Sequence, residues 1–158
     1  MTPTENLINR FYTCFKNSDY KGMQACYSDK ARFSDPVFQQ LSATEVKAMW
    51  EMLCKRAKDL DLEFGDIKAN ETEGSASWTA DYTFSQTGKK VTNHIKARFK
   101  FENGLIVEHN DHFNFYNWSR QAFGLPGLLL GWTPFMKKKV RASARKGLNA
   151  FMNKSSGQ

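Results

Sequence analysis

The 158-residue sequence has no apolar run long enough to cross a bilayer. Its longest, residues 125–132, is broken by one proline and two glycines, whereas a membrane-spanning helix needs about 20 apolar residues. Residues 1–9 are polar and show no signal-peptide pattern. The three cysteines are an odd set without metal-ligand spacing, so we expect reduced thiols, no metal site and a cytoplasmic protein.

The sequence also lacks acidic residues beyond Asp111. Residues 112–158 contain eight lysines and arginines, so this part carries a charge of +8 and the rest, by difference from +7, about −1. We therefore expect an α+β domain over residues 1–118 and a basic C-terminal extension, residues 119–158, packed on the same domain.

Hydrophobic periodicity predicts helices first and strands afterwards. Helical spacing begins near Thr4, resumes around residues 20–27, and returns after a capping-box pair, Ser42 and Glu45. Strand-like alternation covers residues 31–37, 60–64, 75–85, 91–101 and 104–118, with a hairpin turn at 86–89. This order indicates an α+β fold: a cone-like curved antiparallel sheet, with N-terminal helices over its concave face and a C-terminal helical extension.

The predicted strand 104–118 contains the principal candidate site. Alternate residues share a face of a strand, which places His109 and Asp111 among Val107, Phe113 and Phe115. A carboxylate in apolar surroundings is costly unless it is paired or its pKa shifts. We interpret the two polar residues as either a catalytic pair or a buried structural hydrogen bond. By the same parity, His94 and His112 face away.

Asp35 likewise falls on the apolar face of its strand, just before Pro36. It is either a third catalytic residue or a turn residue that accepts hydrogen bonds from the following backbone. All three acid–base candidates are expected to point into one cavity. We expect its substrate-binding wall to consist of aromatic residues, namely Tyr12, Trp50, Trp78, Tyr82, Phe99 and Phe113.

Several short segments carry a family resemblance. Arg10-Phe11, residues 17–19, residues 29–31, the run Ser34-Asp35-Pro36-Val37 and the run 104–107 (Gly-Leu-Ile-Val) occur in an order similar to that of the nuclear transport factor 2-like superfamily. This superfamily includes ketosteroid isomerases and SnoaL-like polyketide cyclases. The resemblance covers about residues 4–116, and it places Asp35 at the position of the isomerases' general base.

Two isomerase positions are not retained. Phe11 stands where the resemblance calls for the oxyanion tyrosine, and Ala97 stands where it calls for the protonated aspartate. Steroid isomerisation is therefore not expected. SnoaL-like cyclases use an aspartate with a nearby histidine, an arrangement that His109 and Asp111 resemble more closely.

The sequence thus leads to three hypotheses. The first is acid–base catalysis, by cyclisation or isomerisation, on a hydrophobic carbonyl compound without a metal or organic cofactor; either Asp35 or Asp111 is the base. The second is a non-catalytic protein that binds a hydrophobic small molecule. The third is a membrane-surface protein that acts through its basic C-terminal helix.

The third hypothesis rests on residues 135–152, where an apolar stripe recurs at helical spacing beside lysines and arginines. That stripe predicts either a helix packed on the domain or a weak contact with anionic membranes. A homodimer is also expected, because a single curved sheet leaves its convex face uncovered. The predicted inner face lacks interleaved basic and aromatic residues, so we expect no nucleic-acid partner.

Overall fold

The computed structural model describes residues 1–156. Its elements are, in chain order, α1 (Pro3–Lys16), α2 (Tyr20–Gln24), β1 (Tyr27–Ser34), β2 (Leu41–Ser42), α3 (Ala43–Arg56), β3 (Asp61–Ala69), β4 (Glu73–Thr83), β5 (Lys90–Glu102), β6 (Leu105–His112), α4 (Phe115–Phe123), α5 (Leu125–Leu130) and α6 (Pro134–Ser156).

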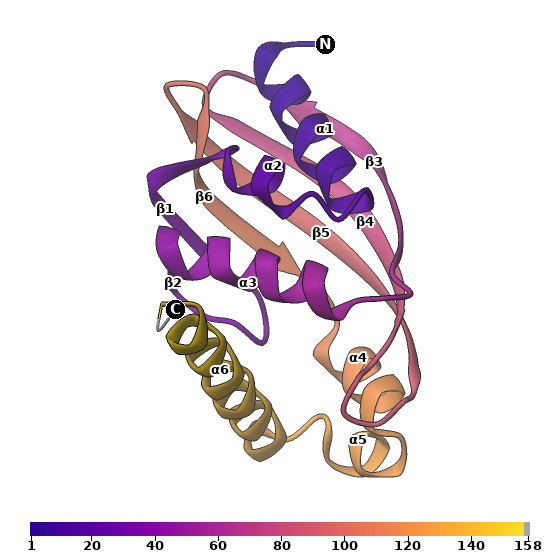
Figure 1. Ribbon diagram of the computed structural model, residues 1–158. Coiled ribbons are helices and arrows are strands. Elements are labelled where there is room, and N and C mark those ends of the chain that lie inside the picture. The colour runs from indigo at the N-terminus through magenta and orange to yellow at the C-terminus, as the bar shows by residue number, and fades with distance from the viewer. Residues whose placement is uncertain (157–158) are drawn as a thin grey trace.

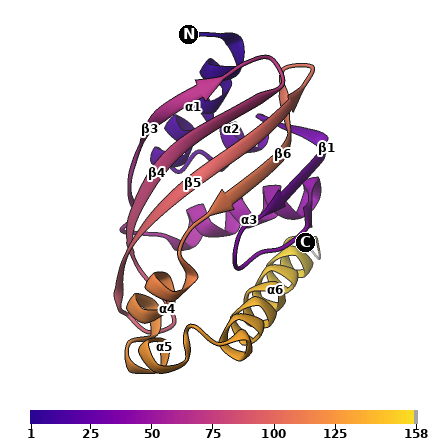
Figure 2. The same ribbon diagram turned by 180° about the vertical axis from the view of Figure 1, so that it is seen from behind.

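The fold is built on one curved sheet of six strands, in the order β2-β1-β6-β5-β4-β3. The helices α1, α2 and α3 cover one of its faces, as Figures 1 and 2 show from opposite sides. The α+β architecture predicted from the sequence is confirmed. The sheet is mixed rather than wholly antiparallel, because β1 runs parallel to β6.

Local sequence explains where the helices begin. Thr2 and Glu5 form a capping box at α1, two residues before the predicted cap, and Ser42 and Glu45 form the predicted one at α3. In β5, buried and exposed residues alternate without interruption, so one face of the sheet is apolar and the other is charged. The predicted hairpin between β4 and β5 is also present.

The predicted strand 104–118 was too long. Strand β6 ends at His112, and Asn114 accepts a hydrogen bond from the backbone N–H of Asn117 and so caps α4. The expected boundary at residues 118/119 therefore falls inside α4. Tyr27 was also misplaced, since it begins β1 instead of continuing α2.

The C-terminal helices lie toward the end of the molecule opposite the N-terminus (Figure 1). Met136 and Val140 of α6 are buried in a second apolar cluster with Trp118, and Leu148 belongs to the main core. The apolar stripe of α6 thus packs on the domain. No helix within residues 1–156 combines the length and apolar character needed to span a membrane.

Candidate functional site

A cavity of about 550 Å³ lies between the sheet and the helices α3, α4 and α6. Aromatic and aliphatic side chains form most of its wall, including Phe15, Met49, Trp50, Trp78, Ile95 and Phe113. This volume lies within the usual range for small-molecule sites. Two carboxyl groups, those of Asp35 and Asp111, interrupt the apolar wall.

Asp35 follows β1 in a tight loop, which fixes one of its carboxyl oxygens. Its Oδ1 accepts hydrogen bonds from the backbone N–H groups of Val37 at 2.7 Å and Phe38 at 2.6 Å. The turn role suggested by the sequence is therefore present. In α6, Arg141 Nε donates to the carbonyl of Pro36 at 2.9 Å, so the C-terminal helix holds this loop in place.

The environment of Asp35 favours its protonated form. Burial is the largest cause and raises the pKa of Asp35 from 3.8 to about 7, despite the opposing hydrogen bond from the Phe38 backbone. The negative charge of Asp111 raises this pKa further, while the Val37 backbone and Arg141 lower it. A carboxyl group that titrates near neutral pH can both accept and release a proton.

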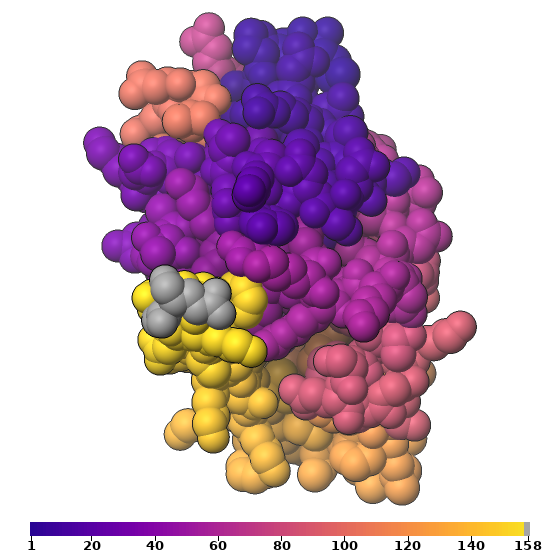
Figure 3. Space-filling view, in the orientation of Figure 1, coloured from indigo at the N-terminus to yellow at the C-terminus, as the bar shows by residue number. Residues whose placement is uncertain are grey.

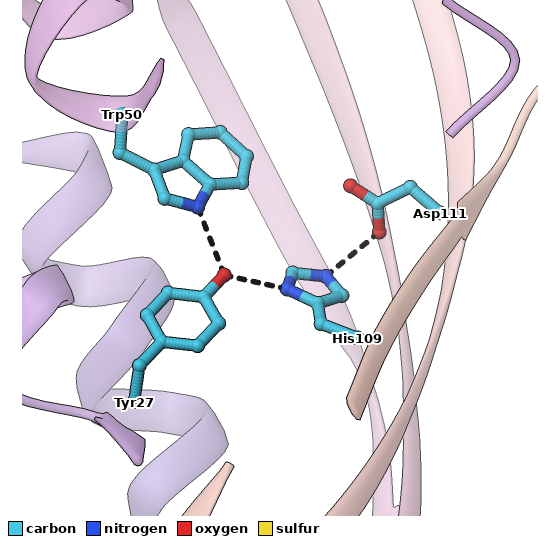
Figure 4. Close-up of polar contacts among 4 residues, drawn as sticks. All are labelled: Tyr27, Trp50, His109 and Asp111. Atoms are coloured by element: carbon cyan, nitrogen blue, oxygen red, sulfur yellow. Dashed lines mark hydrogen bonds and ion pairs between the residues drawn. The ribbon is translucent and has the colours of Figure 1, made fainter. Parts of the chain in front are cut away.

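Asp111 is held by a chain of buried hydrogen bonds (Figure 4). Trp50 Nε1 donates to the Tyr27 hydroxyl at 2.8 Å, the Tyr27 oxygen lies 2.7 Å from His109 Nδ1, and His109 Nε2 lies 2.9 Å from Asp111 Oδ1. These residues come from α3, β1 and β6, so the chain joins one covering helix to two adjacent strands.

One arrangement of protons gives every bond of this chain a donor and an acceptor. Trp50 is only a donor, so the Tyr27 oxygen accepts from it and keeps its own proton for His109 Nδ1. A neutral His109 then carries its proton on Nε2 and donates it to Asp111 Oδ1. Asp111 itself lines the cavity. Burial raises the pKa of Tyr27 well above 10, so its phenol stays protonated.

Two neutral polar groups also line the cavity. Trp118 Nε1 donates to the Tyr82 hydroxyl at 2.8 Å, which leaves the Tyr82 proton free to bind an acceptor. Burial is the main cause that raises the pKa of Tyr82, and the nearby charge of Asp35 adds to it. Asn93 presents its amide on the same wall, from the otherwise apolar face of β5.

The structure separates the predicted site residues into two groups. Asp35 and Asp111 line the cavity, together with Trp50, Trp78, Tyr82 and Phe113. His109, Tyr12 and Phe99 do not line it, because all three are packed in the core behind the wall. His109 still acts on the site through its hydrogen bond to Asp111. His94 and His112 are exposed, as strand parity predicted.

Three contributors were missed in the sequence. Tyr27 was hidden because it was assigned to a helix. Trp118 was hidden because residues 113–118 were read as a continuation of the strand. Asn93 could have been identified from the sequence, because it is the one amide among Val91, Ile95 and the other apolar residues that alternate along β5.

Other reactive groups do not form a second site. Burial raises the pKa of the Cys26 and Cys54 thiols to about 11, so both stay protonated at neutral pH. Within the described chain, residues 1–156, no group of three or more His, Cys, Asp or Glu side chains is arranged to hold a metal ion.

Comparison with known proteins identifies a family. Residues 8–109 match the model of the SnoaL-like domain. That range includes β1, α3 and the whole of β5, and it ends at His109. None of the curated protein sequences matches the chain significantly.

Solved structures show the same fold at low sequence identity. A nuclear transport factor 2-like protein of unknown function from Burkholderia pseudomallei is 19% identical with a TM-score of 0.69, over 78% of this chain and 100% of that one. An LEH-like epoxide hydrolase from M. tuberculosis is 16% identical with a TM-score of 0.64, over 80% of this chain and 92% of that one. A candidate polyketide cyclase from Xanthomonas campestris is 16% identical with a TM-score of 0.63, over 76% and 96%.

Proposed function

Because the chain belongs to the SnoaL-like domain family, we propose that its cavity performs acid–base catalysis, by cyclisation or isomerisation, on a hydrophobic carbonyl compound. The observation that carries this proposal is the pair of carboxyl groups, Asp35 and Asp111, on one largely apolar wall. Asp35 has a pKa raised to about 7, whereas Asp111 accepts a hydrogen bond from buried His109. A carboxyl group whose pKa lies near neutral is suited to accept a proton from the substrate and to return it.

In the proposed reaction, Asp35 is the base. Its Oδ1 is occupied by the turn, so Oδ2 removes a proton from the carbon beside the substrate carbonyl. The electrons of that C–H bond move onto the carbonyl oxygen and form an enolate. Tyr82 and Asn93 are neutral donors on the cavity wall, and each would stabilise the enolate oxygen by a hydrogen bond.

The proton held by Asp35 then completes either route. In an isomerisation it returns to a different carbon of the enolate. In a cyclisation the enolate carbon attacks a second carbonyl of the same substrate, and the proton neutralises the new alkoxide. Both routes restore the Asp35 carboxylate and need no redox partner. Burial is the main reason that the pKa of Asp35 lies near neutral, and the negative charge of Asp111 adds to it.

The comparisons support this chemistry at the level of the fold. One similar structure is described as a candidate polyketide cyclase, which agrees with a carbonyl substrate. Another is described as an epoxide hydrolase, and an apolar epoxide is therefore the second substrate class to test. A carboxyl pair in an apolar cavity suits proton transfer to an epoxide oxygen as well.

Exchange of the proton beside a carbonyl tests the proposal without knowledge of the product. Apolar 1,3-diketones and polycyclic ketones are incubated with the protein in D2O, and deuterium incorporation is followed by NMR. We expect catalysed exchange that increases with an apparent pKa of about 7. Asp35→Asn should reduce it by roughly 10²–10⁴-fold. The matched control Asp29→Asn changes an exposed carboxyl group and should have no effect.

Binding measured in parallel separates the alternatives. Tight binding of the ketones without exchange by the unmodified protein would contradict catalysis and favour the non-catalytic binding protein. Hydrolysis of epoxides without ketone exchange would retain the acid–base pair but replace the carbonyl substrate. Equal exchange rates in Asp35→Asn and the unmodified protein would rule out Asp35 as the base.

A further inference from the structure

The segment between α4 and α6 exposes an unusual amount of apolar surface. Leu125 and Leu129 of α5 are 65% and 60% exposed, and Trp132 and Phe135 are 70% and 68% exposed. Leu128 and Leu130 are nearly half exposed. We call residues 124–135 the apolar tip. It forms the end of the molecule farthest from the N-terminus (Figure 3).

Glycine packing explains why these leucines face outward. Helix α5 contacts α4 through Gly127 and Gly131, and a Cβ atom added to Gly127 would overlap the backbone carbonyl of Ser119. The face that an ordinary amphipathic helix would fill with leucines is thus occupied by glycines. Contiguous exposed apolar patches on a soluble protein mark interaction surfaces.

The backbone of the tip is already hydrogen-bonded. The carbonyls at the end of α5 accept bonds from side chains: Leu128 from Tyr116 at 3.0 Å, Leu129 from Trp132 at 3.1 Å and Leu130 from Thr133 at 2.5 Å. Carbonyls at a helix end normally bond to water. Here they would stay paired in an apolar medium, which is a requirement for burial in lipid.

The charges around the tip are of one sign. Lys138, Lys139 and Arg120 are exposed, Lys89 lies against Gly124, and Lys137 lies over the ring of Phe115. No acidic residue follows Asp111, and within residues 1–156 none of these five cations has an acidic partner within 4 Å. A second copy of this chain would bring the same positive charges against each other.

We propose that the apolar tip docks on the surface of an anionic lipid bilayer. The leucine, tryptophan and phenylalanine side chains enter the interface, and the surrounding lysines bind the anionic headgroups. Pro126 of the apolar tip lines the cavity, as do Met136 and Lys139 shortly after it, so the docked protein would hold its cavity beside the bilayer. The proposal concerns how an apolar ligand reaches the cavity from the membrane, and it does not depend on catalysis.

Trp132 provides a built-in reporter. The other three tryptophans are at most 9% exposed, so a change in fluorescence on docking would come mainly from Trp132. The protein is titrated with vesicles of phosphatidylcholine, alone or mixed with phosphatidylglycerol. We expect a blue shift with the anionic vesicles only, reversed by high salt. Trp132→Phe should remove the shift while co-sedimentation with the vesicles persists.

Two pairs of substitutions separate the apolar and electrostatic parts. Leu129→Ser with Phe135→Ser should weaken vesicle binding roughly tenfold or more, and Lys137→Gln with Lys138→Gln by about 30-fold. The matched controls are Leu105→Ser, an exposed leucine at the opposite end, and Lys30→Gln with Lys68→Gln. Neither control should change binding. Circular dichroism verifies that each variant is folded.

Three results would overturn the proposal. The first is equal binding to neutral and anionic vesicles, and the second is the absence of a Trp132 shift with both. The third is light scattering that shows a dimer converted to monomer by Leu129→Ser with Phe135→Ser, because the tip would then be the interface between two copies of the chain. Ketone exchange measured on the same variants should be unchanged, which keeps this test separate from that of the proposed catalysis.

Discussion

At the scale of single residues, two buried tyrosines differ only in their hydrogen bonds. Tyr27 and Tyr12 are both almost fully buried, but the Tyr27 hydroxyl joins Trp50 to His109, whereas the Tyr12 hydroxyl has no partner. Tyr27→Phe should therefore lower the free energy of unfolding by about 1–3 kcal/mol, because two buried polar groups lose their partner. Tyr12→Phe is the matched control and should cost nothing. Urea denaturation measures both, and equal losses would contradict the hydrogen-bond assignment.

The raised pKa of Asp35 predicts a dependence of stability on pH. Its pKa is about 7 in the folded protein and near 3.8 when unfolded, so the folded state binds this proton more tightly. The stabilising contribution is complete below pH 4 and is lost as the pH rises toward 7. Asp35→Asn lacks this titration. Its free energy of unfolding should therefore increase, relative to that of the unmodified protein, by about 2–4 kcal/mol as the pH rises from 4 to 8. The control Asp29→Asn should show the same dependence of unfolding free energy on pH as the unmodified protein. The same dependence in Asp35→Asn would contradict the raised pKa of Asp35.

Residue parity predicted that Asp35 and Asp111 point into one cavity, and both line it. Asp111 does lie on the apolar face of β6, but Asp35 lies in the loop after β1, because that strand ends at Ser34 and does not continue to residue 37 as predicted. His109 was assigned to the correct face, but alternation cannot tell a cavity wall from the layer behind it. The curvature of the sheet and the packing of the helices determine which inward side chains reach the cavity. Phe99 and Tyr12 are packed in the core instead.

At the scale of elements, a register shift corrects the simple alternation along β6. Phe101 pairs with Ile106 and Lys100 with Glu108, so Val107 is an extra residue that bulges from the ladder. Strand parity placed Ile106 on the outer face, but the bulge turns it inward and it is fully buried. The prediction of one continuous strand over residues 104–118 was wrong for a similarly local reason, because the Asn114 cap starts helix α4.

The glycine contact between α4 and α5 predicts a clear difference between two substitutions. Gly127→Ala should destabilise the protein by about 1–3 kcal/mol, because the new methyl group overlaps the Ser119 carbonyl. Gly147 lies inside α6 with open space at its Cβ position, so Gly147→Ala should stabilise the helix by about 0.5–1 kcal/mol. Thermal unfolding monitored by circular dichroism compares them. Equal tolerance at both positions would mean that α5 is not closely packed on α4.

At the scale of the whole molecule, the C-terminal extension is part of the fold. Arg145 pairs with Glu45 at the start of α3, Arg141 bonds the Asp35 loop, and Leu148 is fully buried in the main core. The sequence predicted a packed basic extension but could not show that it also forms the cavity wall. That wall joins residues more than 80 positions apart, such as Trp50 and Val140, and no local pattern encodes such a contact.

Leu148→Ala tests whether this extension supports the domain. Removal of a fully buried leucine side chain should lower the free energy of unfolding by about 2–5 kcal/mol. The control Leu105→Ala, at an exposed strand end, should have little effect. A change of less than about 0.5 kcal/mol in Leu148→Ala would show that α6 folds as an independent appendage.

The carboxyl pair of Asp35 and Asp111 is central to the proposed function, and one NMR titration tests it directly. The protein is labelled with ¹³C at the aspartate carboxyl carbons, and Asp35 is assigned by comparison with Asp35→Asn. We expect a titration midpoint near pH 7 for Asp35. The midpoint of Asp35 should be lower in Asp111→Asn, because the neighbouring negative charge is removed. A midpoint near the ordinary value of about 3.9, unchanged by Asp111→Asn, would contradict this expectation.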